Sequence, residues 1–143
     1  MAHPDPLASG AGRAPAETDM RSRVTVTRRG VAVGEAIETM RAWSIPAARF
    51  AAILGCSERK WSRVRAGDRN LRLSPTESDR LLRTRQLFEH AVRVFDDDKD
   101  AGTWLSAPND ALSGESPLAL LDTDAGVRLV DDVLTRLEFG VYA

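Results

Sequence analysis

Apolar residues recur at intervals of three and four from about Val33 onward, which is the spacing of one face of an α-helix. The first such face consists of Ala36, Ile37, Met40 and Trp43. Pro46 then suits the first turn of a second helix over residues 47–54, and Gly55 ends it. The pattern therefore predicts two short helices joined by a brief turn.

A third short helix is expected over residues 58–66. Ser57 is a favourable N-cap, and Glu58 would lie at the positive end of the helix dipole. Gly67 is expected to close this helix as its C′ residue, the position at which glycine commonly adopts a left-handed conformation.

The clearest helix start is the run Ser74-Pro75-Thr76-Glu77. Serine at the N-cap, proline at the first helical position and glutamate at the third predict a capping box. The helix is expected to extend to Phe95. Its apolar positions repeat every seven residues, and the seam consists of Leu81, Thr84, Phe88, Ala91 and Phe95. Such a seam fits core packing better than a dimer contact, although both interpretations stay open.

The last third of the chain also indicates helices. Residues 96–100 are acidic and are expected to form a solvated linker, and helices are expected over 101–106, 117–121 and 124–139. The last one would be capped by Asp122 or Thr123 and closed by Gly140, and one apolar stripe runs along it: Val127, Val130, Val133, Leu134 and Leu137. Gly114 and Gly126 are expected to serve tight backbone geometry. The predicted fold is all-α.

The first thirty residues differ from the rest. Residues 1–20 are rich in Pro, Gly and Ala without periodicity, which predicts disorder. Residues 21–30 are basic, and a short strand, a flexible arm that reaches DNA, or a solvated linker all fit them. The chain is therefore divided into an N-terminal arm (1–30), a helical region (31–95) and a helical domain (96–143).

The net charge differs between residues 1–95 and residues 96–143. Residues 1–95 hold 17 Lys/Arg and 10 Asp/Glu, a net of +7, whereas residues 96–143 hold 3 and 11, a net of −8. A basic half suits a polyanion such as DNA, and an acidic half is better placed to bind a protein. Because two modules of about 50 residues bury little core alone, docking or dimerisation is expected.

Several protein classes are excluded by composition. The single cysteine, Cys56, allows no intramolecular disulfide and no cysteine-based zinc site. The longest apolar run, residues 50–54, is far too short to span a membrane. The N-terminus does not have the pattern of a secretory signal, so a cytoplasmic location is expected.

Residues 47–66 fit a twenty-residue helix-turn-helix. With Ala47 at position one, the small Ala51 falls where the two helices cross, and Gly55 falls in the turn. The remaining core positions are all apolar: Phe50, Leu54, Cys56, Trp61 and Val64. Ordinary helical hairpins share this pattern, but the second helix holds four basic residues against one acidic residue, which favours DNA binding.

On this register Trp61 and Val64 face inward and the basic side chains face outward. Arginine can donate two parallel hydrogen bonds to guanine in the major groove, and other basic groups can neutralise phosphates. A solvated charged face is the alternative. The candidate DNA contacts are Ser57, Arg59, Lys60, Ser62, Arg63, Arg65 and Arg69.

No catalytic or metal centre is indicated. His3 lies in the N-terminal arm, and His90 is expected to be a surface residue beside Glu89. Alternating aspartates in 96–100 imitate the start of a calcium loop, but Ala101 and Ala107 stand where glycine and glutamate are required. Without a nucleophile–base pair or a phosphate loop, neither an enzyme nor a cofactor is expected.

Five further stretches carry a family resemblance: LSPTESDRL (73–81), WLSAPN (104–109), ALSGESPL (111–118), LDTDAG (121–126) and LTRLEFGVYA (134–143). Together with the helix-turn-helix they make residues 33–143 resemble the Xre/MbcA/ParS type of antitoxin. The sequence departs from the family at Ser113, where glycine is commoner, and at Phe139, where the residue is often polar. Residues 1–30 are outside the resemblance.

The resemblance implies an Xre-like helix-turn-helix domain followed by a toxin-binding domain. The implied partner is a RES-domain toxin encoded alongside, which degrades NAD or transfers ADP-ribose. The antitoxin would bind the toxin through its C-terminal domain, block the NAD pocket and repress its own operator DNA. A homodimer within a hetero-oligomeric complex is expected, with no membrane partner.

Aromatic and exposed groups of the acidic half are the candidate toxin contacts. They are Trp104, Arg136, Phe139, Val141, Tyr142 and Ala143. Trp104 could equally pack in the core, Arg136 could pair with Asp132, and Tyr142 could fold back onto the apolar stripe. Two other functions stay open: a transcriptional regulator whose C-terminal domain only self-associates, and a toxin-binding module whose helix-turn-helix no longer binds DNA.

Overall fold

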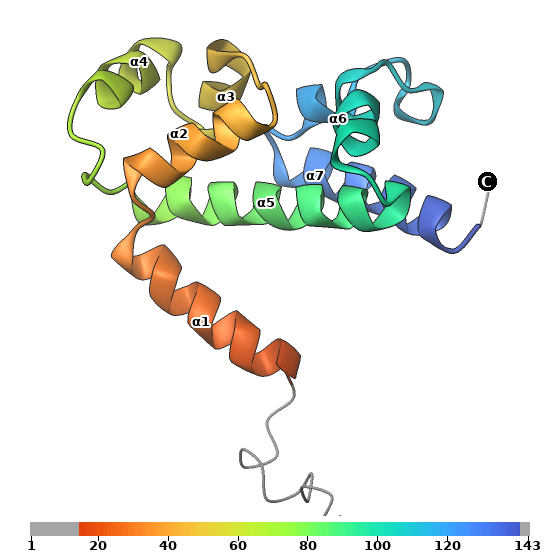
Figure 1. Cartoon of the computed structure of the whole chain (residues 1–143), viewed down its shortest axis with the longest axis horizontal. Coiled ribbons are helices and arrows are strands. Elements are labelled where there is room, and N and C mark those ends of the chain that lie inside the picture. The colour runs from red at the N-terminus through yellow and green to blue at the C-terminus, as the bar shows by residue number, and fades with distance from the viewer. Residues whose placement is uncertain (1–14, 141–143) are drawn as a thin grey trace, which may run out of the picture.

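The computed structural model describes residues 15–140, which form helices joined by short turns (Figure 1). The elements are α1 (Pro15–Arg29), α2 (Val33–Ala42), α3 (Ala47–Leu54), α4 (Glu58–Ala66), α5 (Pro75–Phe95), α6 (Asp98–Ser106), η1 (Asp110–Leu112), η2 (Pro117–Leu120) and α7 (Asp124–Glu138). Over this range there is no β-strand beyond one isolated bridge between Ala32 and Arg72, so the all-α prediction is confirmed. None of these helices is long and apolar enough to cross a membrane.

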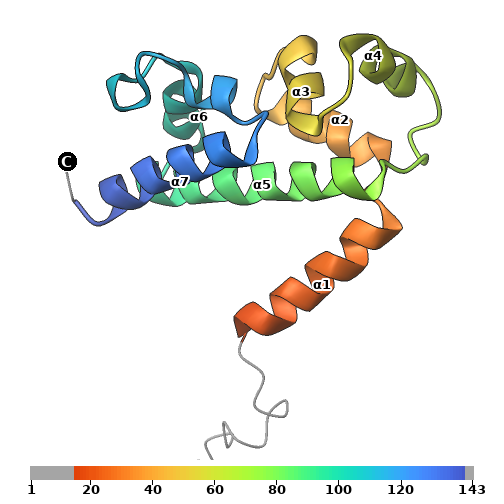
Figure 2. The ribbon, with the colours of Figure 1, turned by 180° about the vertical axis from the view of Figure 1, so that it is seen from behind.

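The long helix α5 is the axis of the molecule. Helices α2, α3 and α4 lie along its N-terminal half, and α6 and α7 lie along its C-terminal half (Figures 1 and 2). The expected capping box is present, because Ser74 and Glu77 each accept a hydrogen bond from the other's backbone N–H. Leu81, Phe88 and Ala91 are fully buried, so the heptad-spaced seam is core packing. One hydrophobic core joins both halves.

The structure of residues 15–30 differs from the prediction. Residues 15–29 form helix α1 rather than a disordered segment, a strand or a linker, and Arg23 attaches this helix to Asp79 and Gln86 of α5. These partners lie more than fifty positions away in sequence, so local composition could not reveal them. The expectation of disorder for residues 1–14 lies outside the described residues.

The acidic stretch 96–100 is also not a solvated linker. Asp97 caps α6 by accepting a hydrogen bond from the Lys99 amide, and the helix therefore begins at Asp98, three residues earlier than expected. Asp96 ends α5 in a left-handed conformation (φ 54°). Only two residues, Asp96 and Asp97, separate α5 from α6, and the two helices pack against each other.

The remaining C-terminal elements follow the predicted order with local differences. The 3₁₀ turn η1 was not foreseen, and the element predicted over 117–121 is a 3₁₀ helix. Thr123, rather than Asp122, caps α7. Gly126 is required because a Cβ there would lie 1.7 Å from the Leu120 carbonyl oxygen. This contact holds the start of α7 against η2.

Candidate DNA-binding and toxin-binding surfaces

Helices α3 and α4 form the predicted helix-turn-helix around an aromatic pair. The rings of Phe50 and Trp61 lie 5.1 Å apart, and both side chains are buried together with Ala51 at the helix crossing. Gly55 adopts φ +80° in the turn, as expected. Gly67, however, has φ −89°, so it ends α4 in an extended conformation rather than as a left-handed C′ residue.

The turn of this motif packs against α5. The Arg80 guanidinium lies over Gly55, where an added Cβ would be 2.1 Å from its nitrogen. Cys56 follows the turn and is half-buried, as a small apolar core residue would be. Burial, and then the nearby Glu77 carboxylate, raises the pKa of its thiol, which makes the thiolate scarce at neutral pH.

Some of the candidate DNA-contacting residues already bind a partner within the chain, and the others do not. The Ser57 hydroxyl accepts a hydrogen bond from the Lys60 amide at 3.0 Å as the N-cap of α4. The Lys60 ammonium binds Glu77 at 3.1 Å, and the Arg65 guanidinium lies 6.0 Å from the Trp61 ring centroid. Arg69 lies 3.7 Å from Glu38. Sequence patterns cannot show these pairings, since the partners of Lys60 and Arg69 come from distant helices.

Arg59, Ser62 and Arg63 remain on the outer face of α4. All three are exposed, and their side chains make no hydrogen bond or ion pair with the rest of the described chain. Because Arg59 and Arg63 are four residues apart, they project from the same side of the helix. The outward register predicted for these residues agrees with the geometry.

The outer face of α7 is the corresponding feature of the acidic half. Phe139, at the C-cap, is 74% exposed, and Leu129 is 54% exposed. Arg136 lies between them in sequence and makes no ion pair with Asp132 among the described residues, so that predicted alternative is wrong. Leu129 was missed from the sequence because it falls outside the buried stripe, and its exposure depends on which side of α7 meets α5.

Trp104 and the last residues complete the predicted set. The Trp104 ring packs 5.6 Å from that of Phe95 and is only partly buried, so it contributes to the junction of α5 and α6. Val141, Tyr142 and Ala143 lie outside the described residues, as does the suggested contact of Tyr142 with the α7 stripe.

His90 is not the surface residue that the sequence indicated. It is buried between α5 and α7, with Nδ1 2.7 Å from Asp131 Oδ1 and Nε2 2.8 Å from Glu138 Oε2. Asp131 and Glu138 lie about two turns apart on α7, so the imidazole holds that helix at two points. No group of acidic, histidine or cysteine side chains that could hold a metal ion occurs among the described residues.

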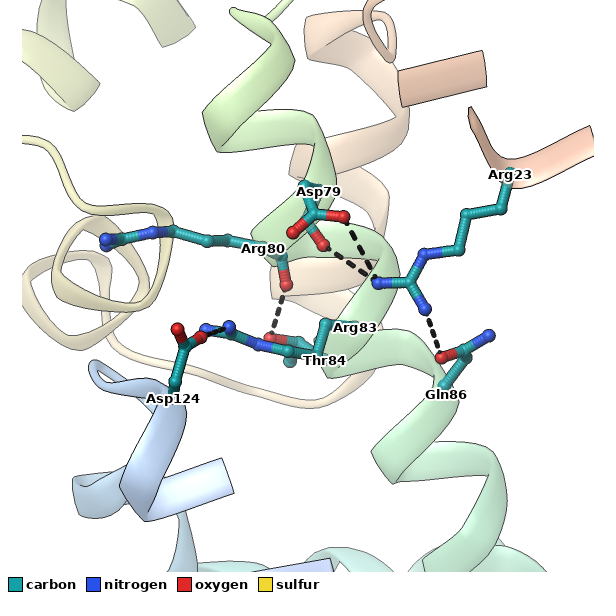
Figure 3. Close-up of polar contacts among 7 residues, drawn as sticks. All are labelled: Arg23, Asp79, Arg80, Arg83, Thr84, Gln86 and Asp124. Carbon is teal, nitrogen blue, oxygen red and sulfur yellow. Dashed lines mark hydrogen bonds and ion pairs between the residues drawn. The ribbon is translucent and has the colours of Figure 1, made fainter. Parts of the chain in front are cut away.

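A second polar junction lies near the start of α7. Figure 3 shows Arg83 of α5 reaching Asp124 in the first turn of α7, and Arg23 of α1 reaching Asp79 and Gln86 on the same central helix. Asp124 also lies at the positive end of the α7 dipole. Helix α5 thus makes polar contacts with both α1 and α7.

Comparison with known proteins matches both halves to domain families. Residues 22–84 match the antitoxin Xre-like helix-turn-helix domain, and residues 90–140 match the antitoxin Xre/MbcA/ParS C-terminal toxin-binding domain. The first match begins at residue 22, so the family likeness extends further toward the N-terminus than the sequence stretches indicated. The two domains define a helix-turn-helix antitoxin.

Similar curated proteins agree with this class. An antitoxin Xre from Yersinia enterocolitica is 36% identical over 127 residues, covering 85% of this chain and 84% of that protein. An antitoxin Xre from Photorhabdus laumondii is 33% identical over 92 residues (64% and 61%), and one from Pseudomonas putida is 34% identical over 73 residues (51% and 46%). The chain belongs to the Xre family of antitoxins.

Proposed function

We propose that this antitoxin neutralises a RES-domain toxin encoded beside it by covering the toxin's NAD site, and that it represses their shared operator through α4. The observation that supports it most is the toxin-binding domain match over residues 90–140, on which α7 presents exposed apolar groups. The family resemblance supplies the toxin class. The protein acts by binding and not as an enzyme, in the cytoplasm where operator DNA is found.

The toxin-facing surface is assigned to the outer side of α7. Leu129 and Phe139 are exposed apolar anchors of the kind that protein interfaces bury, and Arg136 supplies a directional donor between them. Residues 96–143 carry a net charge of −8, so the complementary toxin surface has an apolar centre and a basic rim. The C-terminal residues 141–143 would extend this surface toward the NAD entrance.

The first test is co-purification with the product of the adjacent gene, followed by toxin-catalysed NAD consumption with increasing antitoxin. Leu129→Ala and Phe139→Ala should each weaken inhibition by about 1 kcal/mol or more, since both remove exposed anchors. Leu71→Ala is the matched control, because Leu71 is similarly exposed but lies in the DNA-binding half. A chain ending at Gly140 tests the last three residues, with its melting temperature recorded alongside.

The outcomes separate the candidate functions. If no toxin co-purifies and NAD consumption is unaffected, a plain transcriptional regulator becomes the better account. If the toxin binds but the α7 variants inhibit like the unchanged protein, the toxin surface lies elsewhere on the domain. Loss of inhibition by the shortened chain at constant stability would support a contact from residues 141–143.

On the DNA side, Arg59 and Arg63 are proposed to contact base edges, and Lys60, Arg65 and Arg69 to contact phosphates when they exchange their intramolecular partners. Ser57 and Ser62 flank them as hydroxyl donors. A homodimer is proposed because operators recognised by helix-turn-helix proteins repeat as two half-sites.

A further inference from the structure

A basic groove lies between α5 and α7, two helices that pack against each other. It is lined from both helices by Arg83, Gln86, Leu87, His90, Arg93, Val127, Arg128 and Asp131. Three of these eight residues are arginines and one is acidic, whereas residues 96–143, to which α7 belongs, carry a net charge of −8. The acidic one, Asp131, is already held by His90 at 2.7 Å. The groove is thus locally basic beside the acidic half of the chain.

The three arginines of this groove differ in whether they are free to bind a ligand. Figure 3 shows Arg83 reaching Asp124 in the first turn of α7, so its charge is already paired. Arg93 and Arg128 are exposed, and their side chains make no hydrogen bond or ion pair with the rest of the described chain. The groove therefore offers two free guanidinium groups, one from each helix.

We propose that this groove binds an acidic segment of the toxin, whose aspartate or glutamate carboxylates pair with Arg93 and Arg128. The proposal rests on the proposed function and adds one acidic feature to a toxin surface that is otherwise expected to be basic. A guanidinium group donates two parallel hydrogen bonds to a carboxylate, and such charge-assisted bonds are stronger than neutral ones. Leu87 and Val127 supply an apolar part of the lining, which the methylene groups of an acidic side chain can cover and an inorganic anion cannot.

The position of the groove favours the toxin as its occupant. Both free arginines lie within residues 90–140, which match the toxin-binding domain. Arg128 and Phe139 are about three helical turns apart, so they project from the same side of α7. The groove therefore borders the outer face of α7 that is assigned to the toxin above.

Nucleic acid fits the groove less well than an acidic protein segment. Gln86 lines the groove and also binds Arg23 of α1, and α1 projects from α5 on the side away from α4 (Figures 1 and 2). The groove thus lies apart from the helix that is proposed to read DNA. A long polyanion would also meet the exposed Asp124 and Asp132, which lie one turn to either side of Arg128 and would repel it.

The experiment measures the affinity of the full antitoxin for the toxin, and its inhibition of toxin-catalysed NAD consumption, over a series of salt concentrations. Arg93→Gln/Arg128→Gln should weaken binding about tenfold or more at physiological salt and reduce its dependence on salt, because two ion pairs are lost. Arg41→Gln/Arg49→Gln is the matched control, since it removes two exposed arginines outside the groove and should leave toxin binding unchanged. Circular dichroism and melting temperatures check that both variants remain folded.

A cross-link identifies the toxin residues. Arg93→Lys and Arg128→Lys keep the positive charge and provide a primary amine, which a carbodiimide couples to a neighbouring carboxylate. An amide forms, and the carbodiimide takes up the water that is released. Peptide mass analysis of the treated complex should find positions 93 and 128 joined to aspartates or glutamates of the toxin. Antitoxin treated without the toxin shows which links form within the chain.

The outcomes separate this groove from the proposed function. If the unchanged protein binds no toxin, both fail together. If the toxin binds but Arg93→Gln/Arg128→Gln retains full affinity, or if both positions cross-link only within the antitoxin, the groove assignment alone is overturned. Weakened promoter binding with unchanged toxin binding would mean that the groove takes DNA phosphates, which also overturns it. An equal loss for Arg41→Gln/Arg49→Gln would assign the effect to net charge and not to the groove.

Discussion

At the scale of single residues, function depends on which charged groups have no partner inside the chain. Seven candidate DNA contacts can be read from the helix-turn-helix register, and their outward direction follows from the inward positions of Trp61 and Val64. The sequence could not show that Lys60 is held by Glu77, or that His90 is buried between two carboxylates, because those partners are supplied by packing between distant helices. The spacing of residues along the helix thus predicts which way a side chain points, and tertiary contacts decide whether that side chain is free to bind DNA.

This difference in availability predicts an order of effects on DNA binding. Arg59→Ala and Arg63→Ala should each weaken binding to the promoter by about 1–3 kcal/mol, the value of a bidentate base contact. Lys60→Ala should cost less, since its ammonium must first leave Glu77. Promoter titrations at physiological salt measure all three. Equal losses for the three variants, or unchanged binding by both arginine variants, would show that α4 docks in another orientation.

At the scale of elements, the helices with local start and stop signals were predictable. Those from Val33 to Phe95 have caps, turn residues and apolar spacing within their own sequence, and the structure confirms them. Helix α1 also has local end signals, since it begins at Pro15 and is followed by Gly30 at φ +88°. Its few apolar positions hid it in the sequence, and its attachment to α5 through Arg23 is a long-range contact. The start of α6 was hidden by a run of aspartates that looked solvated. Acidic residues at a helix start are favourable, which explains the early start of α6.

The capping box of α5 predicts a pH-dependent stability. Burial alone would raise the pKa of Glu77, but hydrogen bonds from the Ser74 amide and from Lys60 outweigh it, and the pKa lies below its ordinary value of 4.5. A carboxyl whose pKa is lowered on folding stabilises the protein above its unfolded pKa, and this stability is lost as pH falls through the folded pKa. Glu77→Gln should therefore lower the free energy of unfolding by about 0.5–1 kcal/mol at neutral pH.

Denaturant titrations from neutral to acidic pH measure this difference, which should shrink below 4.5 and disappear in stronger acid. Glu89→Gln is the control, because Glu89 is exposed on the same helix and has no hydrogen-bond partner among the described residues. A difference between Glu77→Gln and the unchanged protein that stays constant into acid would contradict the role of the carboxylate.

At the scale of the whole molecule, the two family matches divide between residues 84 and 90, inside helix α5, rather than at residue 95. Helix α5 contributes Leu81, Phe88 and Ala91 to the one core that both halves share, and it packs against α3 as well as α7. Removing residues 47–66 to isolate toxin binding would expose this face of α5, so we expect that truncation to unfold the remainder. Surface variants such as Arg59→Ala and Phe139→Ala separate the two functions without this loss.

The shared helix predicts that both halves unfold together. Leu134 is fully buried on α7, and Leu134→Ala should cost about 2–5 kcal/mol through lost burial and the cavity left behind. If α5 couples the halves, the most protected amides of α3 should lose the same protection as those of α7 in native-state hydrogen exchange. Leu129→Ala, exposed on the same helix, should change neither. Retention of full protection in α3 would show that the helix-turn-helix domain is stable on its own, and that α5 joins the two domains without transmitting stability between them.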